Sequence, residues 1–231
     1  MKILALETSG MAGEVALLEE GQVIAEQMLA PDQRTARSLT PGMASILQEA
    51  SLQPTEIALI AVTIGPGSFT GLRVGVTAAK TFAYAVGGGC LGIDTLEVMA
   101  SQATHCQALE LWSVMDAQRQ QLFAARFQRA DSGQAWRLVE AAQVIDNERF
   151  LAELTPGVAV TGLGLQKLVG RLPSDVETIA LSRWQPRAAT VGQLAWRDYQ
   201  AGRRDDFWTL APHYIRPSAA EEKQTAPRKS V

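Results

Sequence analysis

The sequence predicts an α/β protein made of two similar lobes with a cleft between them. Residues 2–8 and 57–64 are apolar almost throughout, as expected of strands that are covered on both faces. Between such strands the apolar spacing changes to three and four residues, which is typical of helices. The order of elements in residues 1–104 then recurs in residues 105–216. A chain built twice from one plan usually forms two lobes, so we expect a cleft between them.

Residues 1–104 begin with an antiparallel group of strands. The strand KILALET (2–8) is followed by EVALLEE (14–20) and QVIAEQML (22–29), which Gly21 joins in a tight hairpin. Apolar residues at helical spacing then predict a helix over 35–50. The rest of this half is predicted as a strand at 57–64, a helix at about 70–86 ended by glycines 87–89, a short strand at 90–93 and a helix capped by Asp94.

Residues 105–216 repeat this order. The predicted elements are strands at 110–117, 121–128 and 135–141, a helix at 143–154, a strand at 157–162, a short helix at 163–172, a strand at 176–181 and a helix at 187–202. Five apolar residues should then anchor the segment 204–216 on the body of the protein, namely Phe207, Trp208, Leu210, Tyr214 and Ile215. Residues 217–231 mix charge, alanine and proline, and are predicted to be a disordered tail.

Composition limits the function classes. The chain has 231 residues, is 47% apolar and carries a formal net charge of -3, so no basic domain supports nucleic-acid binding by this chain alone. No uninterrupted apolar segment approaches the roughly 20 residues of a membrane helix. The opening MKILALETSG is too short for a signal peptide, and Glu7 interrupts it. Cys90 and Cys106 fit two reduced, buried thiols. We therefore expect a cytoplasmic protein that does not associate with membranes.

The most distinctive stretch is GPGSFTG (65–71). A Walker loop needs a lysine where Leu72 stands, and the G-x-G-x-x-x-G spacing is one residue longer than the dinucleotide fingerprint. Ser68 or Thr70 would still cap the next helix and leave its first N–H groups for an anion, with Arg73 nearby. The alternative is a tight turn where a helix and a sheet pack closely. The residues favour the structural interpretation, and both stay open.

Polar residues follow the first strand of each half. Glu7, Thr8 and Ser9 end the first strand of the first half, and Asp116 takes the matching place in the second. Such residues fit a position facing the cleft. The hydroxyls of Thr8 and Ser9 equally fit a structural role, in which they form hydrogen bonds with the backbone of the turn. Two facing acids alone are a weak indication of a metal.

The sequence offers little support for a metal or nucleophile site. His105 and His213 are far apart, and no H-E-x-x-H pair or G-x-S-x-G elbow is present. A catalytic cysteine–histidine pair from Cys106 and His105 is not expected, because sequence neighbours point apart on a strand or helix. We expect no catalytic residues and no metal ligands.

Three stretches together resemble the TsaB family, also called YeaZ. They are KILALETS (2–9), TIGPGSFTGLRVGVTAAKTFA (63–83) and APHYIR (211–216), and the resemblance covers residues 1–216. It implies two ribonuclease H-like lobes in tandem, as in the actin-like, sugar-kinase and Hsp70-like ATPase fold. Residues 1–104 would form the lobe that carries the dimer and partner face, and residues 105–216 the second lobe.

The resemblance also implies a function. Members of this family are non-catalytic subunits that pair with TsaD and, through it, with TsaE. The complex transfers threonylcarbamoyl from threonylcarbamoyl-adenylate to N-6 of the adenosine next to the anticodon of ANN-reading tRNAs. The chain would form a homodimer or a TsaD heterodimer through its first-lobe helices, and would meet tRNA only through the complex. No cofactor would be tightly bound, with ATP a candidate near the junction with TsaD.

Site residues follow from the same resemblance. The implied partner interface comprises Leu39, Met43, Leu72, Arg73, Val76 and Lys80. The candidate cofactor-binding residues are Thr8, Ser9, Gly67 and Ser68.

Two positions depart from the family pattern. Arg34–Thr35 stands where the family often has histidine–threonine, and Asp116-Ala117-Gln118 stands where it often has Asp-Ala-Arg. Both departures weaken a metal or anion site at these places.

A competing hypothesis is an ATP-binding or ATP-hydrolysing enzyme of the same fold. It rests on the polar residues that end the two first strands and on the glycine turns at 65–71 and 162–164. A metalloprotease is a third hypothesis, which no set of ligands supports.

Overall fold

The computed structural model describes residues 1–30 and 35–216, which form two five-stranded sheets. The first sheet has the order β3-β2-β1-β4-β5. Strand β1 pairs antiparallel with β2 and parallel with β4. The strands are β1 (Lys2–Glu7), β2 (Glu14–Glu19), β3 (Gln22–Met28), β4 (Ile57–Gly65) and β5 (Gly89–Asp94).

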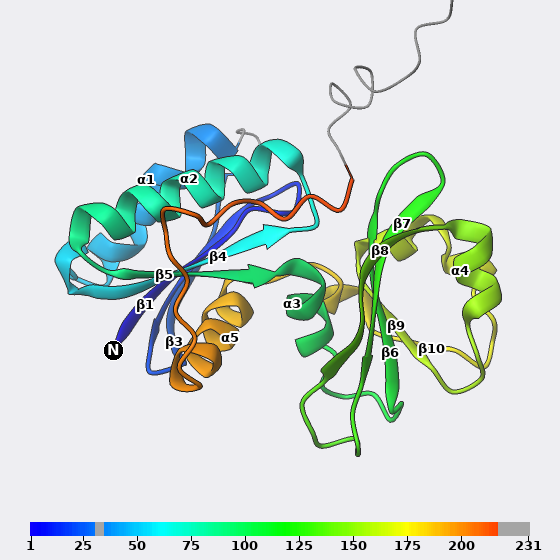
Figure 1. Cartoon of the computed structure of the whole chain (residues 1–231). Coiled ribbons are helices and arrows are strands. Elements are labelled where there is room, and N and C mark those ends of the chain that lie inside the picture. The colour runs from blue at the N-terminus through cyan, green and yellow to red at the C-terminus, as the bar shows by residue number, and fades with distance from the viewer. Residues whose placement is uncertain (31–34, 217–231) are drawn as a thin grey trace, which may run out of the picture.

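Helices cover both faces of the first sheet. Helices α1 (Thr35–Glu49) and α2 (Phe69–Val86) pack on one face, and α5 (Ala188–Gln200) packs on the other (Figure 1). Because apolar side chains leave both faces of β1 and β4, two separate hydrophobic clusters form, one under each layer of helix. This explains the continuous apolar runs of these two strands.

The second sheet repeats the order of the first. Its order is β10-β9-β6-β7-β8, which matches β5-β4-β1-β2-β3 strand for strand. Helix α3 (Thr95–Ser101) packs on one face and α4 (Asn147–Glu153) on the other. The strands are β6 (Glu110–Asp116), β7 (Gln121–Gln128), β8 (Arg137–Asp146), β9 (Ala159–Thr161) and β10 (Glu177–Thr178). The predicted doubling of one supersecondary plan is therefore confirmed.

Three elements of the second half differ from the prediction. Strand β8 continues to Asp146 because residues 143–146 pair with β7, so the helix predicted from 143 begins at Asn147. The single helix predicted at 163–172 is two 3-10 turns, Leu163–Lys167 and Val169–Arg171. The strand predicted at 176–181 shortens to two residues.

Helix α5 was predicted within the second lobe, residues 105–216, and the structure corrects this. Its buried residues pack on the first sheet. The buried Glu14 carboxylate on β2 also holds the N-terminal end of the helix there, because it accepts hydrogen bonds from Arg187 Nε at 2.9 Å and from Ala188 N at 2.8 Å. Residues 187–216 thus lie with the first lobe, although they follow the second in sequence. The tail predicted at 217–231 lies outside the described residues.

Helix α2 approaches β1 unusually closely at two glycines. A Cβ atom at Gly71 would lie 2.1 Å from the Thr8 carbonyl oxygen, and one at Gly75 would lie 2.1 Å from Thr8 Oγ1. A side chain at Gly71 would collide with the backbone, and one at Gly75 would collide with the Thr8 side chain. The structural interpretation of the glycines in GPGSFTGLRVG is therefore correct for Gly71, and it extends to Gly75.

Replacing Gly75 by alanine should destabilise the fold, although alanine normally favours a helix by about 1 kcal/mol. Because the new methyl group would overlap Thr8, we expect the free energy of unfolding to fall by about 2 kcal/mol, within the usual cost of overpacking. Urea unfolding would measure this. Gly170→Ala is the matched control, since a Cβ there meets nothing within 4 Å.

Adding Thr8→Ala to Gly75→Ala should recover part of the loss. The obstacle at Gly75 is the Thr8 side chain, whose hydroxyl has no hydrogen-bond partner that would be lost. Strictly additive losses in the double variant would show that this contact does not set the position of α2.

Candidate functional site

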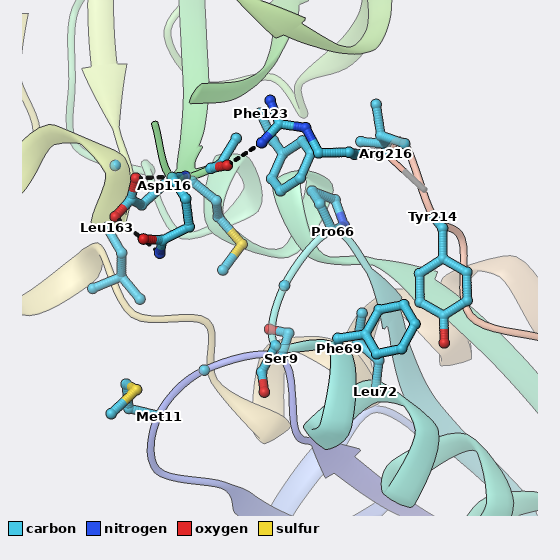
Figure 2. Close-up of a pocket in the computed structure, with 18 of the residues that line it drawn as sticks. Ser9, Met11, Pro66, Phe69, Leu72, Asp116, Phe123, Leu163, Tyr214 and Arg216 are labelled. Carbon is cyan, nitrogen blue, oxygen red and sulfur yellow. Dashed lines mark hydrogen bonds between the residues drawn. The ribbon is translucent and has the colours of Figure 1, made fainter. Parts of the chain in front are cut away.

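A cavity of about 860 Å³ lies between the two lobes. Ser9, Gly67 and Ser68 line it from the first lobe, and Asp116 lines it from the second. Figure 2 shows Ser9 and Phe69 on one side, Asp116 and Leu163 on the other, and Tyr214 and Arg216 beside them. Three of the four predicted cofactor-binding residues thus meet at one site with Asp116. Thr8 does not, because its side chain is buried against Gly75 of α2.

Hydrogen bonds hold the first-lobe wall of the cavity. The Glu7 carboxylate accepts Ser9 N at 2.7 Å and also accepts the Ser9 hydroxyl. Ser9 O in turn accepts Ser68 N at 2.8 Å, and Ser68 Oγ caps α2 by accepting Gly71 N at 3.2 Å. The sequence offers Ser68 or Thr70 as the cap of this helix, and the structure confirms Ser68. The two loops that end β1 and β4 are therefore one connected unit.

Glu7 itself is completely buried beneath this wall. Burial raises the pKa of its carboxyl to about 7, although the hydrogen bonds from Ser9 act in the opposite direction. The group therefore changes charge near neutral pH, directly under the residue that lines the cavity.

An ion pair occupies the second-lobe wall. Asp116 accepts Lys167 Nζ at 2.6 Å and the backbone N–H of Gln118 at 3.0 Å. Gln118, Arg119 and Gln120 are left-handed, with φ of 62°, 52° and 61°, in the turn that joins β6 to β7. Gln118 and Arg119 line the cavity, so an arginine lies one residue beyond the position where the family pattern has it. Asp116 is thus part of an ion pair within its own lobe.

The segment Arg203–Arg216, here called the C-terminal strap, runs along the first lobe beside α2 (Figure 1). Lys80 Nζ donates to the carbonyl oxygens of Trp208 at 3.0 Å and Leu210 at 2.9 Å. Arg73 Nε donates to the Tyr214 hydroxyl at 2.9 Å. Two of the predicted partner-interface residues, Arg73 and Lys80, therefore bind this chain's own strap.

Most of the predicted strap anchors are confirmed. Phe207 and Leu210 pack on the first-lobe core, and Tyr214 stacks on Phe69 with ring centroids 4.5 Å apart. Ile215 is half-buried at the cavity. Trp208 is the exception, because it touches the neighbouring aromatic rings but stays 68% exposed.

The other four predicted interface residues belong to the core. Leu39, Met43, Leu72 and Val76 are 1%, 5%, 1% and 3% exposed. Their helical spacing marks the buried sides of α1 and α2. An arginine at Val76 would therefore disrupt the core and report nothing on pairing.

A groove of about 520 Å³ runs between the outer sides of α1 and α2. Small, uncharged residues border it and Arg73 contributes a charge, while Leu39 and Met43 form its buried floor. Ala36 and Ala78 are among the small residues of both helices that the sequence offers for close approach of a partner helix, whereas sequence reasoning missed Thr40, Val74, Thr77 and Thr81. The signal for all of them is the small uncharged residues between the core positions of both helices.

Other sequence-based predictions concern single residues. Cys90 and Cys106 are free and buried, as predicted. Within residues 1–30 and 35–216, no three His, Cys, Asp or Glu side chains gather as metal ligands do. In the same part of the chain, no helix has the length and hydropathy that a membrane crossing requires. Arg34 lies outside the described residues.

The fold and the cavity define a class. Two tandem lobes of the same strand order, with a cavity where β1, β4 and β6 end, make this a two-lobed ribonuclease H-like protein of the actin-like fold. The structure of YeaZ from Pseudomonas aeruginosa is similar, with a TM-score of 0.79 and 26% identity over 92% of this chain and 99% of that one.

Sequence comparisons identify the family. TsaB of Escherichia coli is 34% identical over 96% of this chain and 98% of its own length. TsaB of Bacillus subtilis is 34% identical over 55% of this chain and 56% of its own length. The family model of TsaD, tRNA N6-adenosine threonylcarbamoyltransferase, matches residues 23–163. The chain belongs to the TsaB family, also called YeaZ.

Replacing Glu7 by glutamine should change how stability depends on pH. In the folded protein the pKa of Glu7 is about 7, against an ordinary 4.5. The stability that this raised pKa contributes is present in full below pH 4.5 and is lost as the pH rises through 7. We expect wild type to lose about 3 kcal/mol relative to Glu7→Gln over this interval.

Urea unfolding at a series of pH values would measure this difference. Glu19→Gln, at an exposed position on β2, is the matched control. Parallel pH profiles for wild type and Glu7→Gln would contradict the assignment.

Proposed function

We propose that this chain is a non-catalytic subunit that pairs with the transferase TsaD through the outer sides of α1 and α2. Its relatives are named tRNA threonylcarbamoyladenosine biosynthesis proteins. The paired enzyme, with TsaE joined through it, transfers threonylcarbamoyl from its adenylate to N-6 of the adenosine next to the anticodon of ANN-reading tRNAs. The chain works in the cytoplasm, holds no tightly bound cofactor and meets tRNA only through the complex.

The groove between α1 and α2 is the observation that carries this proposal. Apart from Phe82 and Arg73, its rim consists of small residues that let a partner helix approach closely, and Arg73 provides its charge. Depletion of charge at the centre of a surface is typical of protein interfaces. Thr40 and Thr77 are exposed on the two sides of the groove and mark the area a partner would cover.

Similarity to the transferase explains how such a pair forms. The transferase family model matches residues 23–163, a stretch that includes both α1 and α2. Two chains with the same helix pair can meet about an approximate two-fold axis, with each pair of helices facing its counterpart. The same surface would serve a homodimer when the transferase is absent, so the two assemblies exclude one another.

A nucleotide-binding enzyme is the second candidate. The cavity between the lobes favours it, because Ser9, Gly67 and Ser68 lie together there, and the junction with TsaD is a further place for ATP. The ion pair of Asp116 with Lys167 opposes it, since a phosphate would have to compete with that carboxylate for the lysine. We therefore expect no saturable heat when ATP and Mg²⁺ are titrated into the isolated chain. Saturable binding that Ser68→Ala weakens would favour the second candidate.

Replacing Thr77 by arginine should weaken pairing with TsaD. Thr77 is exposed on α2, so the helix and its core side are preserved while a long charged side chain enters the groove. We expect the dissociation constant to rise about tenfold or more, equivalent to at least about 1.4 kcal/mol. Light scattering and titration with TsaD from the same organism would measure it, and tRNA modification should fall in parallel.

Val139→Arg is the matched control for this substitution. Val139 is a 45% exposed apolar residue on β8 of the second lobe, away from the groove. If Val139→Arg weakened pairing while Thr77→Arg left it unchanged, the partner surface would lie on the second lobe and the proposal would be wrong.

A further inference from the structure

We infer that the C-terminal strap is an inter-lobe latch, in which Arg216 ties the first lobe to the second and sets the width of the cleft. This inference concerns the relative position of the lobes, and it stands whether or not the proposed pairing with TsaD is correct. It rests on where the chain crosses between the lobes and on which hydrogen bonds hold each crossing.

Two linkers cross between the lobes at one place. The first is the junction of β5 with α3, because β5 belongs to the first sheet and α3 packs on the second, and the other, near residues 180–187, leads into α5. The side chain of Gln102, which is 8% exposed, donates to the carbonyl oxygens of Arg183 at 3.0 Å and Gln185 at 2.8 Å. Its own oxygen accepts Arg187 N at 2.9 Å. The second linker is therefore fastened to the end of α3, and Arg197 on α5 donates to Glu97 on α3 at 2.8 Å, so the two crossings form a single hinge.

A hinge at one place allows the two lobes to rotate relative to each other. In two-lobed proteins, opening and closing occurs by rotation about a few linker residues. The hinge contacts at Gln102 resist separation of the linkers, but they do not restrain the far side of the cleft. A second connection, away from the linkers, is needed to restrain that rotation.

The strap provides the second connection, and the first lobe holds it firmly. Asp205 Oδ2 accepts Gly92 N at 2.9 Å on the edge strand β5, and Phe207 packs on the core. Further along, His213 N donates to Ile64 O at 2.7 Å where β4 ends. The end of the strap thus has a fixed position at the mouth of the cavity.

Arg216 then reaches the second lobe. Its guanidinium donates to the carbonyl oxygen of Ala117 at 2.6 Å (Figure 2). It also donates to the side-chain oxygen of Gln121. Ala117 and Gln121 flank the left-handed turn at Gln118–Gln120, and Ala117 N donates to Gln121 O at 2.9 Å, so the acceptor is itself well ordered. A planar group with two donors fixes direction as well as distance, which a single donor does not.

The cavity lies between these two connections. His213, Tyr214 and Arg216 line one side of it, while Gln185 of the second linker lines another. Rocking of the lobes would break the Arg216 hydrogen bonds before it broke any contact of the strap with the first lobe. The latch therefore determines whether the cleft keeps one width or samples several.

Distance measurements between spin labels test this inference. Met11→Cys, 97% exposed on the first-lobe side, and Val169→Cys, 55% exposed next to the second-lobe wall, would carry the labels. The natural cysteines are buried and stay unlabelled. Dilution with unlabelled chain removes distances between copies. We expect one narrow distance distribution in the labelled wild type, and a longer, broader one when Arg216→Ala is added.

Two further variants complete the test. Arg204→Ala is the matched control, because Arg204 donates to Tyr199 O and Arg203 O beside the first lobe, and it should leave the distribution unchanged. Arg216→Lys keeps the charge but replaces the planar guanidinium by an ammonium group, whose donors are not held in one plane. It should give an intermediate width, and it provides the test if Arg216→Ala fails to fold. A distribution that is identical in wild type, Arg216→Lys and any folded Arg216→Ala would overturn the inference.

Discussion

The close approach of α2 to the end of β1 positions everything else at the site. Gly67, Gly71 and Gly75 lie on one side of α2 and its loop, and each would collide with Thr8 or Ser9 if it carried a Cβ. Because this contact fixes α2, it also fixes Ser68 against Ser9 at the cavity and the outer side of the helix at the groove. The second lobe repeats the arrangement, with Gly162 and Gly164 against the backbone of residues 114–115.

Three sides of helix α2 consequently make different contacts. One packs on the sheet, a second holds the strap through Arg73 and Lys80, and the third borders the groove. This division explains why the same helix contributes to the core, to the connection between the lobes and to the proposed partner surface. It also separates the two candidate functions in space, since the groove lies on the outside of one lobe and the cavity lies between both.

Local sequence signals predicted most of the fold but only part of the site. The order of elements along the chain, the caps Ser68 and Asp94, and the doubled plan follow from periodicity and turn chemistry, which act over short distances. Helical spacing on α2 does not by itself separate core positions from surface positions, so Val76, predicted at the partner interface, lies in the core. The amphipathic pattern of α5 does not say which sheet it covers, because its contacts with the first sheet, including the hydrogen bond from Ala188 N to Glu14, come from residues far away in sequence. The contacts of Gln102 and Arg216 leave no local signal.

Hydrogen exchange of this chain, alone and mixed with TsaD from the same organism, tests most directly whether it acts through its helices. The account predicts slower amide exchange in α1 (Thr35–Glu49) and α2 (Phe69–Val86) on mixing, with the loops at residues 9–13 and 117–120 unchanged. Protection confined to those cleft loops, with both helices unaffected, would contradict the account and place the partner at the cavity.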